Sequence, residues 1–409
     1  MKLFCLILVM TAIASGGAVG ESAGEQDDDD LRTVANRLAR DIIIVDAHVD
    51  TPYRLWDEFE DISRRTEKGD FDYVRARAGG LSAPFMAIYT SPKRERDGTA
   101  RFLADSLINM VEGWPVKWPD KFEIVTTPAA VTRAAGEEKI ALLLGMENGA
   151  PIAGDIENVE YFFDRGVRYI TLAHAENNHI CDSSFDKERT WNGLSPFGRA
   201  VVKEMNRLGM IIDVSHISDD AFYQVVELSR APVIATHSGC RHFTPGFERN
   251  MADDMIELMA EKGGMININF GSIFVNDECR RRFSMARQEV ERMTKEKELD
   301  PDDPRVRDLW RDYLAEHPIG FADISDVANH IDHVANLVGV DHVGFGSDFD
   351  GLGDSLPTGL KDVSAYPNLI YELLKRGYTE EDVAKIASGN IFRVMEDVRR
   401  VAAELKEDG

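Results

Sequence analysis

Short, continuous apolar runs recur along the chain from residue 42 onwards, and between them apolar residues repeat at helical spacing. Runs this short and this apolar are typical of strands that are buried on both faces, as in a parallel sheet. We therefore expect eight strands, at residues 42–45, 85–88, 140–144, 167–172, 210–214, 233–235, 265–270 and 343–345.

Helix-start signals lie between several of these strands. Ser195 and Pro196 form a favourable N-cap and first-turn pair, and Ser218 followed by two aspartates opens another helix. Further apolar stripes at helical spacing cover 255–259 and 327–337. Regular alternation of eight strands with helices predicts an α/β fold, a (β/α)8 TIM barrel. An open, doubly wound sheet is the alternative, but no Gly-x-Gly-x-x-Gly turn follows the first strand.

Two connections are longer than the rest. Residues 89–138 follow the second predicted strand, and the Arg- and Glu-rich residues 271–325 follow the seventh. Loops that follow barrel strands lie on the catalytic face, so both insertions are expected to shape a pocket there. A single TIM-barrel domain then covers residues 41–400.

The N-terminal residues differ from the barrel region. Lys2, an apolar run and a series of small residues give residues 1–20 the pattern of a secretory signal peptide. The run is too short for a stable membrane span, although an uncleaved anchor is the alternative. Residues 21–40 form an acidic linker in this interpretation. We expect an exported protein, periplasmic or extracellular, with no stable membrane anchor after signal cleavage.

Charge and cysteine content narrow the partners. The chain of 409 residues has a net charge of −25 at pH 7, which argues against binding of nucleic acid or anionic membranes. Signal removal leaves Cys181, Cys240 and Cys279, none with the Cys-x-x-Cys spacing of a zinc or redox site. Because Cys240 and Cys279 follow the sixth and seventh strands, we predict a disulfide between them.

Ionisable side chains stand where the predicted strands end. The carboxyl ends of barrel strands converge on one mouth, so these side chains are expected to meet there. Crowding so many ionisable groups is costly unless divalent cations neutralise them. Imidazole and carboxylate donors without thiolate favour zinc over manganese, cobalt or iron, and their number favours two ions over one. The residues are His48, Asp50, Glu147, His174, His216, His237 and Asp348.

Five motifs resemble, in the same order, those of the membrane (renal) dipeptidases, the zinc-dependent, amidohydrolase-like peptidase family M19. The resemblance covers about residues 40–395. It implies a metallopeptidase that hydrolyses dipeptides, with D-configured C-terminal residues commonly accepted, by a hydroxide bridging two zinc ions. It also implies a homodimer. The motifs are His48-Val-Asp50-Thr-Pro, Gly145-Met-Glu-Asn-Gly149, Asp213-Val-Ser-His216, Thr236-His-Ser238 and Gly346-Ser-Asp-Phe-Asp-Gly351.

The resemblance assigns the metal ligands residue by residue. One zinc is held by His48, Asp50 and Glu147. The other is held by Glu147, His216 and His237, so that Glu147 bridges the two ions.

The same resemblance assigns the remaining roles. His174 and Asp348 are catalytic and contact the substrate: His174 on the carbonyl side of the reaction, Asp348 as the group that transfers protons. Arg249 binds the terminal carboxylate of the substrate, with Arg241 as the nearby competitor for this role.

Two other functions fit the pattern of strand-end residues. One is a different dinuclear hydrolase of the amidohydrolase type, such as a lactonase or an acyl-amino-acid hydrolase. That architecture often bridges its metals with a carboxylated lysine, whereas the third strand here offers Glu147. The other is a metal-binding protein without catalysis, against which the presence of His174 and Asp348 argues.

Overall fold

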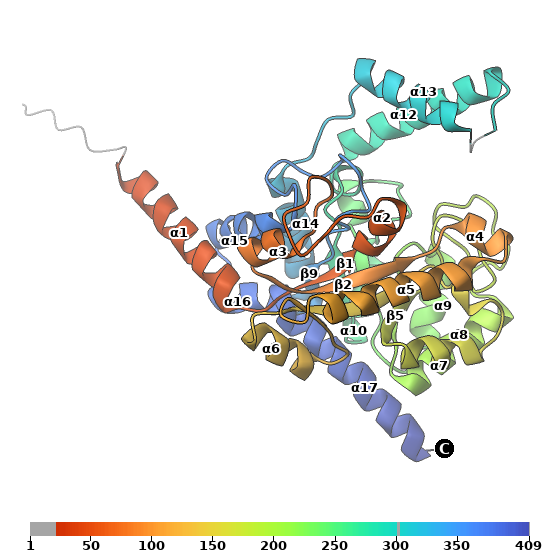
Figure 1. The fold of residues 1–409 in the computed structure, drawn as a ribbon, viewed down its shortest axis with the longest axis horizontal. Coiled ribbons are helices and arrows are strands. Elements are labelled where there is room, and N and C mark those ends of the chain that lie inside the picture. The colour runs from red at the N-terminus through yellow and green to blue at the C-terminus, as the bar shows by residue number, and fades with distance from the viewer. Residues whose placement is uncertain (1–21, 301–302, 409) are drawn as a thin grey trace, which may run out of the picture.

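A ring of parallel strands forms the centre of the molecule in a computed structural model that describes residues 22–300 and 303–408. In spatial order the strands are β1 (Ile44–Val49), β2 (Leu81–Tyr89), β4 (Ile140–Glu147), β5 (Val167–Thr171), β6 (Ile211–Asp213), β7 (Ile234–Ser238), β8 (Met265–Ile268) and β9 (Val343–Phe345). The ring closes after β9, where the Asp50 backbone N–H donates to the Phe349 carbonyl at 2.8 Å. Helices surround the strands (Figure 1). The predicted (β/α)8 TIM barrel is confirmed.

The barrel interior is filled by apolar side chains. Every residue of β4 is buried, as expected for a strand covered on both faces. Val45, Phe85, Tyr169 and Met265 pack in one cluster with the apolar face of α17 (Asn390–Asp408). This dense packing holds the strand ends in fixed positions, which a site built from several strands requires.

Predicted helix starts are confirmed in the segments between strands. The Ser195 hydroxyl accepts the Gly198 N–H at 2.9 Å and caps α8 (Pro196–Leu208). The Ser218 hydroxyl caps α9 (Asp219–Leu228) in the same way. The predicted stripes lie in α10 (Asp253–Glu261) and α14 (Ile324–Val338), and the other helices around the ring are α2 (Thr51–Asp57), α3 (Tyr73–Gly79), α7 (Glu157–Asp164), α15 (Tyr366–Lys375) and α16 (Glu380–Ala384).

The first insertion contains elements that the apolar pattern did not indicate. It folds into α4 (Pro92–Arg96), α5 (Ala100–Lys117), β3 (Phe122–Ile124) and α6 (Pro128–Gly136). Strand β3 pairs in parallel with β4, outside the ring. Trp114 and Phe122 are buried there, so this insertion packs against the barrel.

The second insertion forms an arm. Helices α11 (Ser272–Val275), α12 (Asp277–Glu296) and α13 (Pro304–Glu316) follow β8, and the α12–α13 pair extends away from the barrel at the upper right of Figure 1. Helix α13 has no buried residue. The base of α12, in contrast, reaches the mouth of the barrel.

The N-terminal region differs from the acidic linker expected for residues 21–40. Helix α1 (Ser22–Asp41) lies beside α15 and buries Ala35, Leu38 and Ala39 against the barrel (Figure 1). Residues 1–20, interpreted as a signal peptide, lie outside the described residues. None of the described helices has the length and apolar content needed to span a membrane.

The cysteines contradict one prediction. Cys181, Cys240 and Cys279 are buried free thiols, so the predicted Cys240–Cys279 disulfide is wrong. The Cys240 sulfur faces the backbone carbonyl of His330 at 3.7 Å instead. Adjacent strands bring two loops together without setting the Cβ positions that a disulfide needs.

Candidate metal centre

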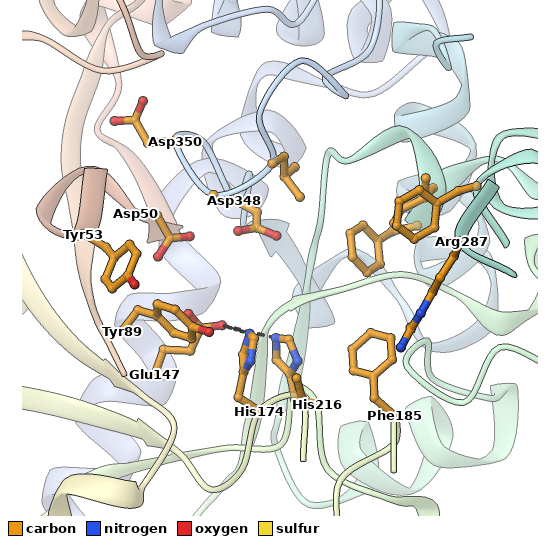
Figure 2. Close-up of a pocket in the computed structure, with 16 residues that line it drawn as sticks. Asp50, Tyr53, Tyr89, Glu147, His174, Phe185, His216, Arg287, Asp348 and Asp350 are labelled. Carbon is orange, nitrogen blue, oxygen red and sulfur yellow. Dashed lines mark ion pairs between the residues drawn. The ribbon is translucent and has the colours of Figure 1, made fainter. Parts of the chain in front are cut away.

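Glu147, at the end of β4, lies at the centre of four imidazoles. Its Oε1 is 3.2 Å from Nε2 of His216, 3.3 Å from that of His237 and 3.5 Å from that of His174. Its Oε2 is 3.5 Å from Nε2 of His48. Figure 2 marks the ion pairs of Glu147 with His174 and His216 by dashed lines. Because its two oxygens face different histidines, this carboxylate has the geometry of a bridge between two ions.

Two aspartates complete the centre on the side of β1. Asp50 Oδ2 lies 3.5 Å from His48 Nε2, and Asp348 offers a further carboxylate within the same cluster. The Asn269 amide donates to Asp348 Oδ2 at 2.8 Å and orients it. All seven residues predicted to meet at the barrel mouth are thus brought together.

Strand register explains how distant segments deliver these side chains to one level. In the parallel pairing, Tyr89 is the partner of Glu147, Glu147 of Thr171, and Thr171 of Asp213. Beyond β6 the backbone of His216 turns into the left-handed region, with φ of +69°. A non-glycine residue in this region carries strain that the surrounding fold must hold, and such strain gathers at functional sites.

A second layer of hydrogen bonds sets the orientation of the His237 ring. The Thr236 hydroxyl donates to Asp213 Oδ2 at 2.7 Å and lies 2.8 Å from His237 Nδ1. Because this hydroxyl gives its proton to Asp213, it accepts one from Nδ1 of His237. The ring therefore presents the Nε2 lone pair to the centre, as a metal ligand does.

His48 is oriented by residues of β5 and of its own strand, β1. Its Nδ1 lies 2.8 Å from the hydroxyl of the fully buried Tyr169. Its backbone N–H donates to Asp46 at 3.1 Å, and Asp46 also accepts the backbone N–H of Ser347 at 2.9 Å. Asp46 thus ties β1 to the segment after β9, and the His48 Nε2 is left facing the centre.

The donor atoms at this centre match the needs of a cation. Nε2 of His216 and Nε2 of His237 lie only 2.8 Å apart, and the buried Nε2 of His48 has no hydrogen-bond partner among the described residues. Burial lowers the pKa of His237 to about 3 and that of His216 well below its usual value, so both rings are neutral. Converging lone pairs of neutral imidazoles and a carboxylate, without thiolate, form a donor set suited to zinc.

The pKa values of His48 and Glu147 reflect the charges of the groups around them. Burial opposes a charge on His48, but the neighbouring tyrosine and carboxylates raise its pKa well above the usual value. Burial also opposes the charge on Glu147, yet the surrounding imidazoles hold its pKa well below the usual value. The protein alone thus draws positive charge into a position that a divalent cation would neutralise.

A cavity of about 450 Å³ opens onto the centre, a size suited to a small ligand. One half carries carboxylates and tyrosines, and the other is apolar (Figure 2). The polar half is formed by Asp50, Tyr53, Tyr89, Glu147, Asp348 and Asp350, and the apolar half by Phe185, Ile273, Phe274, Phe283 and Leu352.

The two candidate arginines have different surroundings. Arg249 is buried beside the centre, where its Nη1 donates to Ser238 Oγ and its Nη2 to the His237 carbonyl, each at 2.7 Å. Arg241 instead forms a two-pronged ion pair with Asp219 at 2.6 and 2.7 Å. Of the two, Arg249 is the one that lies next to the histidines.

Several residues of the site escaped the sequence reasoning. The hydroxyls of Tyr169 and Thr236 and the amide of Asn269 act on the donors from behind, and Arg287 reaches the cavity from the second insertion. The order of strands provided a signal for the first three, since they lie in or directly after β5, β7 and β8. No such signal existed for Arg287.

Comparison with known proteins agrees with this geometry. Residues 32–409 match the membrane dipeptidase family (Peptidase family M19). The chain is 32% identical over 346 residues to the dipeptidase aclJ of Aspergillus oryzae, covering 83% of this chain and 72% of that protein. It is also 32% identical over 382 residues to Dipeptidase 3 of Mus musculus, covering 91% of this chain and 67% of that protein.

Among solved structures, the probable dipeptidase PvdM from Pseudomonas aeruginosa is similar, with a TM-score of 0.79 and 27% identity. The match covers 91% of this chain and 99% of that one. The family match extends over nearly the whole chain, and the metal-ligating side chains required for the chemistry are assembled at the barrel mouth. The chain belongs to the membrane dipeptidases, peptidase family M19, and is a metal-dependent dipeptidase.

Proposed function

We propose that this dipeptidase works with two zinc ions that share Glu147. His48 and Asp50 complete one set of ligands, and His216 and His237 the other. The observation that carries the proposal is the position of Glu147, whose Oε2 faces His48 at 3.5 Å while its Oε1 faces His216 and His237 at 3.2 and 3.3 Å. Zinc held in this way supplies a water of lowered pKa near neutral pH and polarises the substrate carbonyl.

Asp348 is suited to transfer protons. It lines the cavity, and burial raises its pKa to about 6, which allows both uptake and release of a proton near neutral pH. The Asn269 amide holds its carboxylate in place. In this proposal Asp348 accepts the proton of the attacking water and passes it to the leaving amine.

His174 stands across the cavity and acts on the carbonyl side. Burial lowers its pKa, so the ring is neutral and carries one N–H. A neutral imidazole that donates to the developing oxyanion stabilises it without a change of charge at the site.

Arg249 explains the restriction to dipeptides. Burial lowers its pKa to about 10, which leaves the guanidinium charged at neutral pH. Its Nη2 lies 3.0 Å from Nε2 of His216, so a carboxylate bound by Arg249 lies close to the reacting bond. Only a substrate whose free carboxylate follows the scissile bond by one residue can bind Arg249 while its scissile carbonyl lies at the metal centre.

The test is an assay of the zinc-loaded protein with L-Xaa-L-Xaa and L-Xaa-D-Xaa dipeptides, a tripeptide, a lactone and an acyl-amino acid. Cleavage of dipeptides but not of the tripeptide, lost with a chelator, supports the proposal. Activity on the lactone or acyl-amino acid alone identifies the different amidohydrolase-type function, and two bound metals with no turnover identify a silent metal-binding protein. A Glu147→Gln variant that keeps two zinc ions per chain and the full rate would refute the bridging role.

Export and pairing of subunits complete the proposal. The signal-like pattern of residues 1–20 supports an exported, periplasmic or extracellular enzyme, and the family resemblance supports a homodimer. Cell fractionation with N-terminal sequencing of the mature protein tests the first. Light scattering after size-exclusion chromatography tests the second.

A further inference from the structure

Much of the apolar half of the cavity comes from the second insertion, beside Phe185 and Leu352 from loops that follow β5 and β9. Ile273 and Phe274 lie in α11, and Phe283 and Arg287 lie in α12. Figure 2 shows Arg287 extending from α12 toward the cavity beside Phe185. The insertion therefore places its own side chains where they meet a bound dipeptide.

Arg287 differs in charge from every other residue that lines the cavity. Within the described part of the chain it is the one lysine or arginine of the lining, and it stands opposite Asp50, Glu147, Asp348 and Asp350. Because the metals neutralise Asp50 and Glu147 in the proposed function, Arg287 is a charge of the lining left to attract an acidic side chain of the substrate.

The guanidinium of Arg287 has capacity for a ligand. Its Nε donates to Glu291 Oε1 at 2.8 Å, while Nη1 and Nη2 form no hydrogen bond to any residue that the structure describes. The side chain is 59% exposed, whereas that of Arg249 is buried, with Nη1 and Nη2 bonded to Ser238 and His237 and with Nε lacking a partner among the described residues. Arg287 thus suits a group at the cavity rim, and Arg249 suits one deep beside the metals.

Phe274 and Phe283 form an aromatic wall that borders both arginines. The guanidinium carbon of Arg249 lies 5.4 Å from the centroid of the Phe274 ring, and Phe274 shares the apolar half of the cavity with Phe283 and Arg287. When Arg249 binds the terminal carboxylate of a dipeptide, the side chain of the dipeptide's C-terminal residue can extend along this wall toward Arg287. The wall covers the methylene groups of that side chain and leaves its end at the guanidinium.

We propose that Arg287 is a specificity-determining residue that selects dipeptides with an acidic side chain, aspartate or glutamate, in the C-terminal residue. The proposal rests on the proposed function, because it takes the terminal carboxylate to be bound by Arg249. An ion pair of this kind, partly screened by solvent, changes the specificity constant by about 2- to 5-fold.

The experiment compares L-Ala-L-Glu with L-Ala-L-Gln, which have nearly the same shape and differ in charge. We expect the zinc-loaded wild-type enzyme to prefer the glutamate dipeptide in kcat/KM. Arg287→Ala removes this preference by raising KM for L-Ala-L-Glu about 2- to 5-fold, with kcat and the L-Ala-L-Gln constants unchanged. Arg287→Lys retains part of the preference, and Arg287→Glu inverts it in favour of L-Ala-L-Lys.

Arg281→Ala is the matched control. Arg281 lies on the same helix, is also 59% exposed and pairs with Asp277, but does not line the cavity. It should leave the preference intact. Equal loss for both dipeptides in Arg287→Ala, or no wild-type preference, would overturn the proposal while leaving the proposed function standing. No turnover by the wild type of these two dipeptides or of the L-Xaa-L-Xaa and L-Xaa-D-Xaa dipeptides of the functional assay would overturn both.

Discussion

Tyr169 allows metal affinity to be separated from packing. Its hydroxyl lies 2.8 Å from His48 Nδ1, and its fully buried ring packs against Phe85 with the ring centroids 5.2 Å apart. The substitution Tyr169→Phe keeps the ring and removes only the hydroxyl. His48 then loses the partner that fixes its orientation, so we expect the ion on His48 to bind more weakly.

The size of the effect follows from the burial of the pair. A buried polar group left without its partner costs about 1–3 kcal/mol. Loss of a hydrogen bond behind a ligating histidine weakens metal binding by about 10- to 100-fold. This factor corresponds to about 1.4–2.7 kcal/mol, so the two considerations agree. Among the described residues the Tyr169 hydroxyl bonds to His48 and not to His216 or His237, so an ion that these two histidines would hold should keep its affinity.

The assay titrates the zinc-loaded protein with chelators of increasing strength and counts zinc per chain by mass spectrometry. Tyr169→Phe should pass through a state with one zinc at a chelator strength that leaves the wild type with two. Thr236→Val is the companion variant, because it removes the hydroxyl 2.8 Å from His237 Nδ1 and should loosen the other ion. Release of both ions from Tyr169→Phe at the wild-type chelator strength would refute the reasoning.

Three further predictions concern stability. Burial and the neighbouring Asp350 raise the pKa of Asp70 to about 7, so the folded state holds this proton more tightly than the unfolded chain, and the free energy of unfolding falls as pH rises from about 4 to 7. Relative to wild type, Asp70→Asn should therefore gain about 1–2 kcal/mol of stability between pH 4 and pH 8, and a pH-independent difference in urea unfolding would contradict this. A Cβ on Gly145 would lie 2.0 Å from the Tyr169 ring, so Gly145→Ala should lower the unfolding free energy by about 1–3 kcal/mol, and an unchanged melting temperature would show that the ring moves freely. Leu38→Ala opens a cavity under α1 and should cost about 2–5 kcal/mol in denaturant unfolding; a cost near zero would mean that α1 adds nothing to the fold.

The barrel fold and the candidate metal centre could both be predicted from the sequence, for one common reason. Strands buried on both faces leave continuous apolar runs, and a barrel places whatever follows each run at one mouth. Glu147 and His216 were identifiable because they directly follow such runs. Prediction of the site therefore required only the order of strands, without any knowledge of side-chain geometry.

Features set by tertiary contact were not accessible in this way. Strand β3 is only three residues long, and α13 has no buried residue, so neither leaves a periodic pattern strong enough to read. The segment 21–40 reads as an acidic linker, yet three small or aliphatic residues on one face of α1 pack against the barrel. Arg287 reaches the cavity only because of the path that α12 takes, and composition does not encode that path.

The metal-facing donors of the barrel and Arg287 of the second insertion are supported in different ways. Metal-facing donors are held from behind by other strands of the barrel: Tyr169 of β5 supports His48 of β1, and Asp213 of β6 supports His237 of β7 through a threonine hydroxyl. A change on one strand is therefore felt at the donors of another. Arg287, in contrast, stands on a helix of an insertion and, among the residues that the structure describes, forms its ion pair with Glu291 of the same helix. A substitution at Arg287 should therefore change which substrate side chain the enzyme prefers and leave the metal-facing donors of the barrel in place.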